Sequence, residues 1–345
     1  MSRVLHLVGS AVDDFHAELS RLYAGGCLDA LADQVNHVAH ISPDGCWRFS
    51  ADLSDCALAQ APPLPLPDAV RHILALGVDV AIPQMFCLPG MTTYRALLDL
   101  LAIPYLGNRS DVMANAATKH IARAVVAAAG VAVPAGKVVR RGQRPTLAPP
   151  VVVKPVDADN SAGVTLVRDP ADYDAAIESA LAHSRAALIE TYVELGREVR
   201  CGIIVRDGEL VCLPLEEYVV DRDTKPIRTR ADKLARSDAG DLYLVAKDDT
   251  KARIIVDDRS LTERVWAAAR RCHIALGCRH YSLFDFRIDP GGLPWFLEAG
   301  LYCSYAPSSV IPTMAAAVGV SIPDLFEIGL SELRRDAAPC LNTRR

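Results

Sequence analysis

Two acidic residues lie inside strongly apolar stretches near the end of the chain, and this feature constrains the fold more than any other. Residues 281–289 read YSLFDFRID and residues 295–300 read WFLEAG, with Pro-Gly-Gly between them. The pattern predicts a β-hairpin with a Gly-rich turn. On its two strands, Asp285 and Glu298 repel each other unless a cation lies between them. Two carboxylates and phosphate oxygens suit magnesium; the alternative is a pair of exposed strand acids.

A second feature is a lysine at the end of an apolar strand. Residues 151–155 read VVVKP, and the loop DADNSAGV follows at 157–164. Desolvating Lys154 costs free energy unless it meets an anion, and a loop of small polar residues lets backbone N–H groups approach a phosphate. The alternative is a lysine that reaches solvent. A weaker signal is the strand 186–190, which ends in a linker with acceptors suited to adenine and ribose.

The order of the expected elements predicts an α/β protein. In the first 107 residues, strands at 4–8, 78–82 and 104–106 alternate with helices at 13–24, 68–76 and 92–101, which indicates a parallel sheet. An Ala-rich helix over 111–129 ends at Gly130. Further strands are expected at 135–140, 150–154, 164–167, 186–190, 198–205, 210–217, 281–288 and 294–299, with helices at 170–182, 260–275, near 312–318 and, briefly, at the C-terminus.

Composition and missing motifs exclude several classes of function. The net charge of −5, from 37 basic and 42 acidic residues, argues against a nucleic-acid surface. No apolar run reaches the length of a membrane span and the start has no signal core, so we expect a cytoplasmic protein with no membrane partner. The ten cysteines form no Cys-x-x-Cys pair, so a zinc site is not expected. No P-loop, Gly-x-Gly-x-x-Gly or Gly-x-Ser-x-Gly motif is present.

Taken in order, these residues resemble the ATP-grasp superfamily and, within it, the D-alanine–D-alanine ligase family. The resemblance covers roughly residues 4–330 and is most specific in five segments: DVMANAATK (111–119), VVKP (152–155), LIETYV (188–193), FLEAG (296–300) and SSVIP (308–312). It implies an α/β (α+β ATP-grasp) fold. A parallel N-terminal α/β domain (1–107) would precede two subdomains that clasp ATP, one central (108–190) and one C-terminal (191–345). It also implies a homodimer.

The resemblance assigns roles to individual residues. Lys119 and Lys154 would hold ATP phosphates, and Asp285 and Glu298 would bind magnesium, with manganese as an alternative. The other residues implied for ATP are Ser161, Gly163, Glu190, Tyr192, Val193 and Glu198. The residues implied for the substrates are Asp14 (or Asp13), Asn160, Ser308 and Ser309. Ser161 is also a catalytic candidate, and Lys233, in the charged segment 221–241, is the candidate lysine of a lid that excludes water.

The implied reaction joins a carboxylate to an amine through an acyl phosphate, and its substrates would be small molecules, either amino acids or amines. The chain departs from the family pattern at Leu283, where an arginine is expected, and at Gly300, where an asparagine is expected. Because positions 283, 285 and 287 share one face of a strand, Arg287 is our candidate to replace that arginine; the alternative is an ion-pair partner for Asp285. We therefore expect a ligase of specialised metabolism acting on amino acids other than D-alanine. The competing class is a non-catalytic ATP-binding protein.

Overall fold

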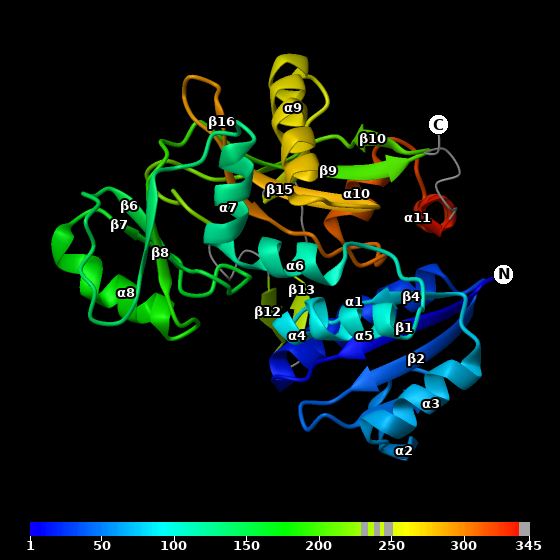
Figure 1. Ribbon diagram of the computed structural model, residues 1–345. Coiled ribbons are helices and arrows are strands. Elements are labelled where there is room, and N and C mark those ends of the chain that lie inside the picture. Colours follow the sequence, from blue (N-terminus) through cyan, green and yellow to red (C-terminus); the bar gives the residue numbers. More distant parts are fainter. Residues whose placement is uncertain (229–233, 238–241, 245–250, 338–345) are drawn as a thin grey trace, which may run out of the picture.

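The structure is a computed structural model and describes residues 1–228, 234–237, 242–244 and 251–337. Its strands form three main sheets and one small hairpin. In Figure 1 the first sheet and its helices lie at the lower right, the second sheet and α8 at the left, and the third sheet above both. None of the helices in the described ranges is both long and apolar enough to cross a membrane.

The first sheet has the order β3-β2-β1-β4. As predicted, β1 is parallel to its neighbours β2 and β4. Sequence reasoning missed β2 and β3, because β2 carries two histidines and an asparagine, and β3 is a short antiparallel edge strand. The elements are β1 (Arg3–Gly9), α1 (Asp14–Ala30), β2 (Val35–Ile41), β3 (Trp47–Ser50), α2 (Asp55–Gln60), α3 (Leu66–Leu76), β4 (Val80–Pro83), α4 (Leu88–Met91) and α5 (Thr93–Leu100).

The tight turn after β1 depends on Gly9. Its φ is +102°, and a Cβ at this position would lie 2.0 Å from the carbonyl oxygen of Ile41. The chain then enters α1 through Asp13, whose side chain accepts a hydrogen bond from the N–H of His16. This geometry brings the start of α1 to the carboxyl edge of the sheet, where ligands bind in open α/β sheets.

The long helix expected over 111–129 is divided in two, and this prediction was wrong. Helix α6 (Ser110–Ala117) ends before Thr118, whose φ of −98° and ψ of 96° are extended, and α7 (Lys119–Ala128) begins directly after it. The hydroxyl of Thr118 donates to the carbonyl of Ala114, and the N–H of Lys119 donates to the carbonyl of Val156 instead of continuing the helix. The break therefore ties the start of α7 to the residue that follows β6.

The second sheet has the order β5-β8-β6-β7 and is antiparallel. Helix α8 (Tyr173–Leu181) packs Ala176 and Ile177 into a cluster with Val151 and Val153 of β6. The strands are β5 (Gly136–Val139), β6 (Val151–Pro155), β7 (Thr165–Val167) and β8 (Ala187–Thr191), and a short 3-10 turn (Pro170–Asp172) precedes α8.

The third sheet has the order β14-β11-β9-β15-β16, with β10 also paired to β9. The single strand expected over 210–217 is divided into β10 and β11, because Pro214 cannot donate to a neighbouring strand. Helix α11 is longer than the brief C-terminal helix expected. The elements are β9 (Arg197–Arg206), β10 (Glu209–Cys212), β11 (Glu216–Tyr218), β14 (Ala252–Ile254), α9 (Arg259–Leu276), β15 (Tyr281–Ile288), β16 (Pro294–Ala299), α10 (Val310–Ala316) and α11 (Ile322–Ala337).

Strand β15 is buried along its whole length because both of its faces are covered. Phe284 and Phe286 join the cluster that contains Val265 of α9. On the opposite face, Tyr281 and Leu283 join the cluster that contains Met314 of α10 and Phe326 of α11. Alternation along the strand places Asp285 and Arg287 on the same face as Leu283.

A separate hairpin, formed by β12 (Leu234–Arg236) and β13 (Leu242–Leu244), lies against α1. The guanidinium of Arg236 donates to both carboxylate oxygens of Glu18, at 3.1 and 2.8 Å. The N–H of Leu242 donates to the same carboxylate at 2.7 Å. One side chain of α1 therefore holds both strands of this hairpin.

Candidate active site

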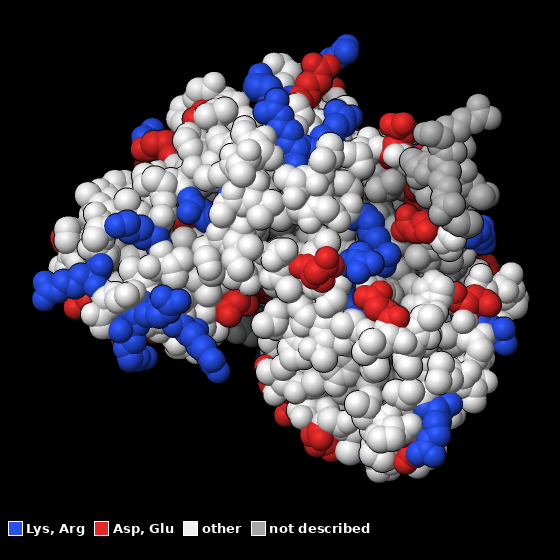
Figure 2. Space-filling view, viewed as in Figure 1, with Lys and Arg blue, Asp and Glu red and all other residues white. Residues whose placement is uncertain are grey.

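Two neighbouring cavities lie between the sheets. The large cavity has a volume of about 480 Å³ and the small cavity about 110 Å³. Three residues line both cavities: Arg228, Asp285 and Glu298. We call these three residues the junction. On the outer face shown in Figure 2, acidic and basic side chains are scattered in small groups between uncharged areas.

Both predicted phosphate lysines line the small cavity and are buried, with 7% of each residue exposed. Lys154 lies at the end of β6, and its Nζ is 2.5 Å from Oε2 of Glu190 on β8. Glu190 also pairs with Arg123 of α7 at 3.0 Å. Two cations thus share one carboxylate, which leaves positive charge available for an anion. Lys119, placed by the break before α7, lies 2.5 Å from the carbonyl of Ala158 and 3.8 Å from Glu298.

The loop after β6 stands over both cavities, because Ser161 lines the small cavity and Asn160 the large one. Both residues have a φ of +56°, a conformation that non-glycine residues rarely adopt and that often occurs where a ligand binds. Gly163 does not line either cavity, but a Cβ there would lie 2.9 Å from the carbonyl oxygen of Ser179. Only glycine fits at this position, so Gly163 determines the path of the loop after β6.

The residues predicted to contact adenine and ribose also line the small cavity, and one of them, Glu190, pairs with Lys154. Tyr192, Val193 and Glu198 line this cavity together with Arg287. The guanidinium of Arg287 lies 2.7 Å from Oε2 of Glu198, donates to the carbonyls of Val193 and Pro226, and lies 5.2 Å from the centre of the Tyr192 ring. Asp285 and Arg287 line the same cavity, as their alternation along β15 predicts. The role of Arg287 at the acyl centre stays a prediction.

The two predicted metal carboxylates face each other across the hairpin. Asp285 and Glu298 are paired in the register of β15 and β16, which shifts directly after Asp285. No cluster of three or more His, Cys, Asp or Glu side chains that could hold a metal exists among the described residues. Because magnesium binds through one or two carboxylates plus phosphate oxygens and waters, these two residues fit one such ion at the junction. Gly300 lines the large cavity and offers no side-chain ligand.

The large cavity has a polar wall and an aromatic wall. The polar wall includes Ser308 and Ser309, which precede α10. Ser309 Oγ is buried, makes no capping hydrogen bond, and has no hydrogen-bond partner among the residues that the structure describes. Its hydroxyl is therefore available to a ligand.

The aromatic wall consists of Tyr23, Phe86 and Tyr302. The ring of Phe86 lies 5.2 Å from that of Tyr23 and 5.4 Å from that of Tyr302, centre to centre. The negative charge of Asp159, followed by burial, raises the pKa of Tyr302 well above its usual value. Tyr302 therefore stays protonated and can donate a hydrogen bond into the cavity.

Several lining residues were missed by sequence reasoning. The predicted substrate residue Asp14 is exposed and lines neither cavity. Its alternative Asp13 lies 2.8 Å from Nδ1 of His16, and the unpredicted His16 lines the large cavity. Arg200 lines it too, and alternation from Glu198 along β9 could have found it. Arg228 lies in the charged segment 221–241, where Lys233 was the only predicted site residue. The lid candidate Lys233 lies outside the described residues.

The comparisons with known proteins agree on one family. A family model described as "D-ala D-ala ligase C-terminus" matches residues 135–330. The D-alanine–D-alanine ligase of Methylorubrum extorquens (strain PA1) is 32% identical over 273 residues, which cover 75% of this chain and 82% of that protein. The vancomycin B-type resistance protein VanB of Enterococcus faecalis is 28% identical over 309 residues, covering 84% and 86%.

Solved structures share the fold. The VanG D-Ala:D-Ser ligase from Enterococcus faecalis superposes with a TM-score of 0.76 at 21% identity, covering 96% of this chain and 99% of that one. The D-alanine–D-alanine ligase from Bacillus anthracis complexed with ATP gives a TM-score of 0.70 at 18% identity, covering 97% and 100%. Together with the sequence matches, this shows that the chain belongs to the D-alanine–D-alanine ligase family, an ATP-grasp family of ATP-dependent ligases.

Proposed function

We propose that this ligase joins an amino-acid carboxylate to an amine through an acyl phosphate, as a step of specialised metabolism. The observation that carries the proposal is the junction. The small cavity brings buried lysines to one side of Asp285 and Glu298, and the large cavity brings a substrate-sized space to the other. A phosphoryl group transferred from one cavity to the other must pass these two carboxylates.

In the first step, an oxygen of the substrate carboxylate attacks the γ-phosphorus of ATP. The bond between that phosphorus and the bridging oxygen breaks, and ADP leaves. Phosphoryl transfer depends mainly on positioning and charge neutralisation. Lys119 and Lys154 provide both from within the small cavity, and Ser161 covers the phosphates from the loop above. Magnesium or manganese, when held by Asp285 and Glu298, supplies further charge neutralisation.

In the second step, the amine nitrogen attacks the acyl carbon and the carbonyl electron pair moves to oxygen. When this oxyanion collapses, the bond from carbon to the phosphate oxygen breaks. Inorganic phosphate leaves, and the nitrogen loses a proton to give the amide. Ser309, with Ser308 beside it, would bind the carboxylate of the second substrate, and Asn160 would close the cavity from above. The hairpin held by Glu18 would help to keep water from the acyl phosphate.

The aromatic wall supports substrates larger than alanine. A methyl side chain would leave most of the surface of Tyr23, Phe86 and Tyr302 without contacts, and unfilled apolar surface loses its dispersion energy. We therefore propose that at least one substrate carries a bulky apolar or aromatic side chain. The competing proposal, a non-catalytic ATP-binding protein, is favoured by Leu283 and Gly300, which line the large cavity without a donor or a metal ligand.

The test is a phosphate-release screen with ATP and magnesium over all L- and D-amino acids, singly and in pairs, with product masses recorded. We expect release of phosphate and ADP with at least one pair, and a product whose mass equals the two substrates minus water. If ATP binds but no pair releases phosphate, the non-catalytic alternative is supported instead.

A further inference from the structure

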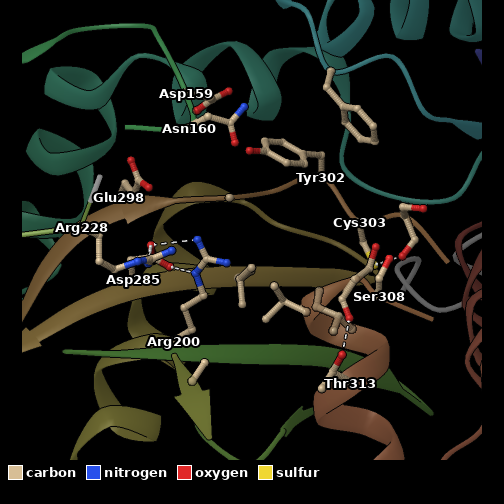
Figure 3. A pocket seen from close by; sticks show the side chains of 18 of the residues that line it. Asp159, Asn160, Arg200, Arg228, Asp285, Glu298, Tyr302, Cys303, Ser308 and Thr313 are labelled. Atoms are coloured by element: carbon tan, nitrogen blue, oxygen red, sulfur yellow. Dashed lines mark hydrogen bonds and ion pairs between the residues drawn. The ribbon is translucent and has the colours of Figure 1, made fainter. Parts of the chain in front are cut away.

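An arginine that no sequence motif indicates lies beside the junction. Arg200 is in the middle of β9, and its Cα pairs in register with that of Asp285 on β15. Its side chain is 14% exposed and lines the large cavity, whereas Arg287 lines only the small one. Figure 3 shows the Arg200 guanidinium beside Asp285, with Arg228 on the other side of the same carboxylate.

The contacts of Arg200 orient it and leave part of it available. Its Nε donates to one oxygen of Asp285 at 2.6 Å and its Nη2 to the other at 3.3 Å. Within the described residues, Nη1 has no hydrogen-bond partner. A guanidinium carries five N–H donors in a rigid fork, so two nitrogens fix its orientation while the third can bind a substrate oxygen.

Arg200 belongs to a group of charged and aromatic side chains around Asp285. Two guanidinium groups lie near the ring of Tyr218, with Cζ of Arg228 at 3.4 Å and Cζ of Arg200 at 5.2 Å from its centre. Arg228 also lies 3.6 Å from Asp285.

A substrate carboxylate that approaches the junction meets Asp285 and Glu298, which repel it. A fixed cation on the side of the large cavity favours both this carboxylate and the oxyanion of the second step. Arg200 and Arg228 both line that cavity, but Arg228 also lines the small cavity and lies 3.9 Å from Glu198 there. Leu283 cannot supply such a cation, although it lines the same cavity. We infer that Arg200 is a catalytic residue that binds the reacting carboxylate and stabilises the oxyanion. The inference rests on the proposed function and names the group that serves its acyl centre.

The test compares Arg200→Met, which removes the charge, with Arg200→Lys, which keeps the charge but loses the fork. Arg206→Met is the control, because Arg206 is exposed at the end of the same strand. On the amino-acid pair found by the screen, we expect turnover of Arg200→Met to fall by about 10²–10³-fold and that of Arg200→Lys by less. ATP affinity should stay within about twofold, and Arg206→Met should match the parent.

A binding measurement separates this inference from the proposed function. Acetyl phosphate, a small acyl phosphate, is titrated by calorimetry into protein saturated with ADP and magnesium. We expect its affinity to fall at least about tenfold in Arg200→Met and to be unchanged in Arg206→Met. If the screen finds no reaction, the proposed function fails while this measurement still decides the role of Arg200. Normal turnover of Arg200→Met, unchanged affinity for the probe, or no binding of the probe to the parent protein would each overturn the inference.

Discussion

The two cavities that meet at the junction are built in different ways. The small cavity is organised by buried ion pairs, Lys154 and Arg123 with Glu190, and Arg287 with Glu198. The large cavity is organised by ring contacts, hydroxyl groups and a few isolated charges. Buried ion pairs tolerate little change, because losing one partner leaves an uncompensated charge. An apolar wall accepts other side chains more readily, which agrees with the proposal that the chain keeps its ATP-binding residues and differs from the family around its substrates.

The largest effect is expected from Arg287→Met, which tests whether the ion-paired cavity also serves the acyl centre. The sequence-based hypothesis predicts that turnover falls by about one to several orders of magnitude while ATP still binds. The contact with Glu198 instead predicts that ATP affinity falls as well, because losing Arg287 leaves the carboxylate of a predicted ribose contact buried and unpaired, which costs about 3–5 kcal/mol in stability. Turnover and calorimetric ATP affinity, measured on one preparation, separate the two. Normal turnover together with unchanged ATP affinity would contradict both.

Lys154→Ala tests the small cavity directly. Removing a charge-assisted contact should weaken ATP binding by roughly 1.5–3 kcal/mol, with the fold intact because Glu190 keeps Arg123 as a partner. Calorimetry with ATP measures the change. Lys137→Ala, an exposed lysine on β5 of the same sheet, is the matched control and should bind ATP normally. An unchanged affinity in the Lys154 variant would show that this lysine is not a phosphate contact.

Ser309→Ala tests the large cavity. Loss of one hydrogen bond, about 1 kcal/mol, should raise the KM for the second substrate roughly fivefold. The melting temperature should stay nearly the same, because Ser309 Oγ makes no capping bond. Ser54→Ala is the opposite control, since Ser54 does cap α2 and its loss should lower stability by about 0.5–2 kcal/mol without changing KM. If the Ser309 variant is destabilised and its kinetics are normal, the serine supports the fold and does not bind the substrate.

The smallest effect is expected from Glu18→Gln, which weakens the attachment of the β12–β13 hairpin to α1. The pair is partly exposed, and such pairs contribute about 0–1 kcal/mol. We expect a modest rise in ADP release that yields no amide, because water reaches the acyl phosphate more often. The measurement is the ratio of ADP to product. Glu178→Gln, which loses an exposed pair with Arg141 far from the cavities, should leave the ratio unchanged; an equal rise there would argue against a lid.

Sequence reasoning found most of the small cavity and little of the large one, for a physical reason. A charged residue inside an apolar strand costs desolvation free energy unless it has a partner. This cost is why Lys154, Glu190 and Asp285 stand out in the sequence. Tyr23 and Phe86 give no such signal, since aromatic residues at these spacings are equally suited to a core. Their place in the large cavity arises only from contacts between segments that are distant in sequence.

The fold, too, was predicted in some parts and missed in others. The short apolar runs of β1, β15 and β16 predict these strands almost to the residue. The break at Thr118 was not predictable from helix propensity, because its cause is a hydrogen bond to Val156, 37 residues away along the chain from Lys119. The position of Arg228 could not be predicted for a similar reason. A charged segment of sequence does not indicate which of its side chains is buried.

The aromatic wall has a consequence for how this protein can diversify. Leu19 and Tyr23 belong to α1 and Phe86 to the segment after β4, and residues 1–107 contribute nothing to the small cavity. Under the proposed function, part of the substrate selectivity can therefore change at these three positions while every lining residue of the small cavity stays the same. A library confined to Leu19, Tyr23 and Phe86 would vary the wall of the large cavity and leave its other lining residues, such as Arg200, Tyr302 and Ser309, untouched.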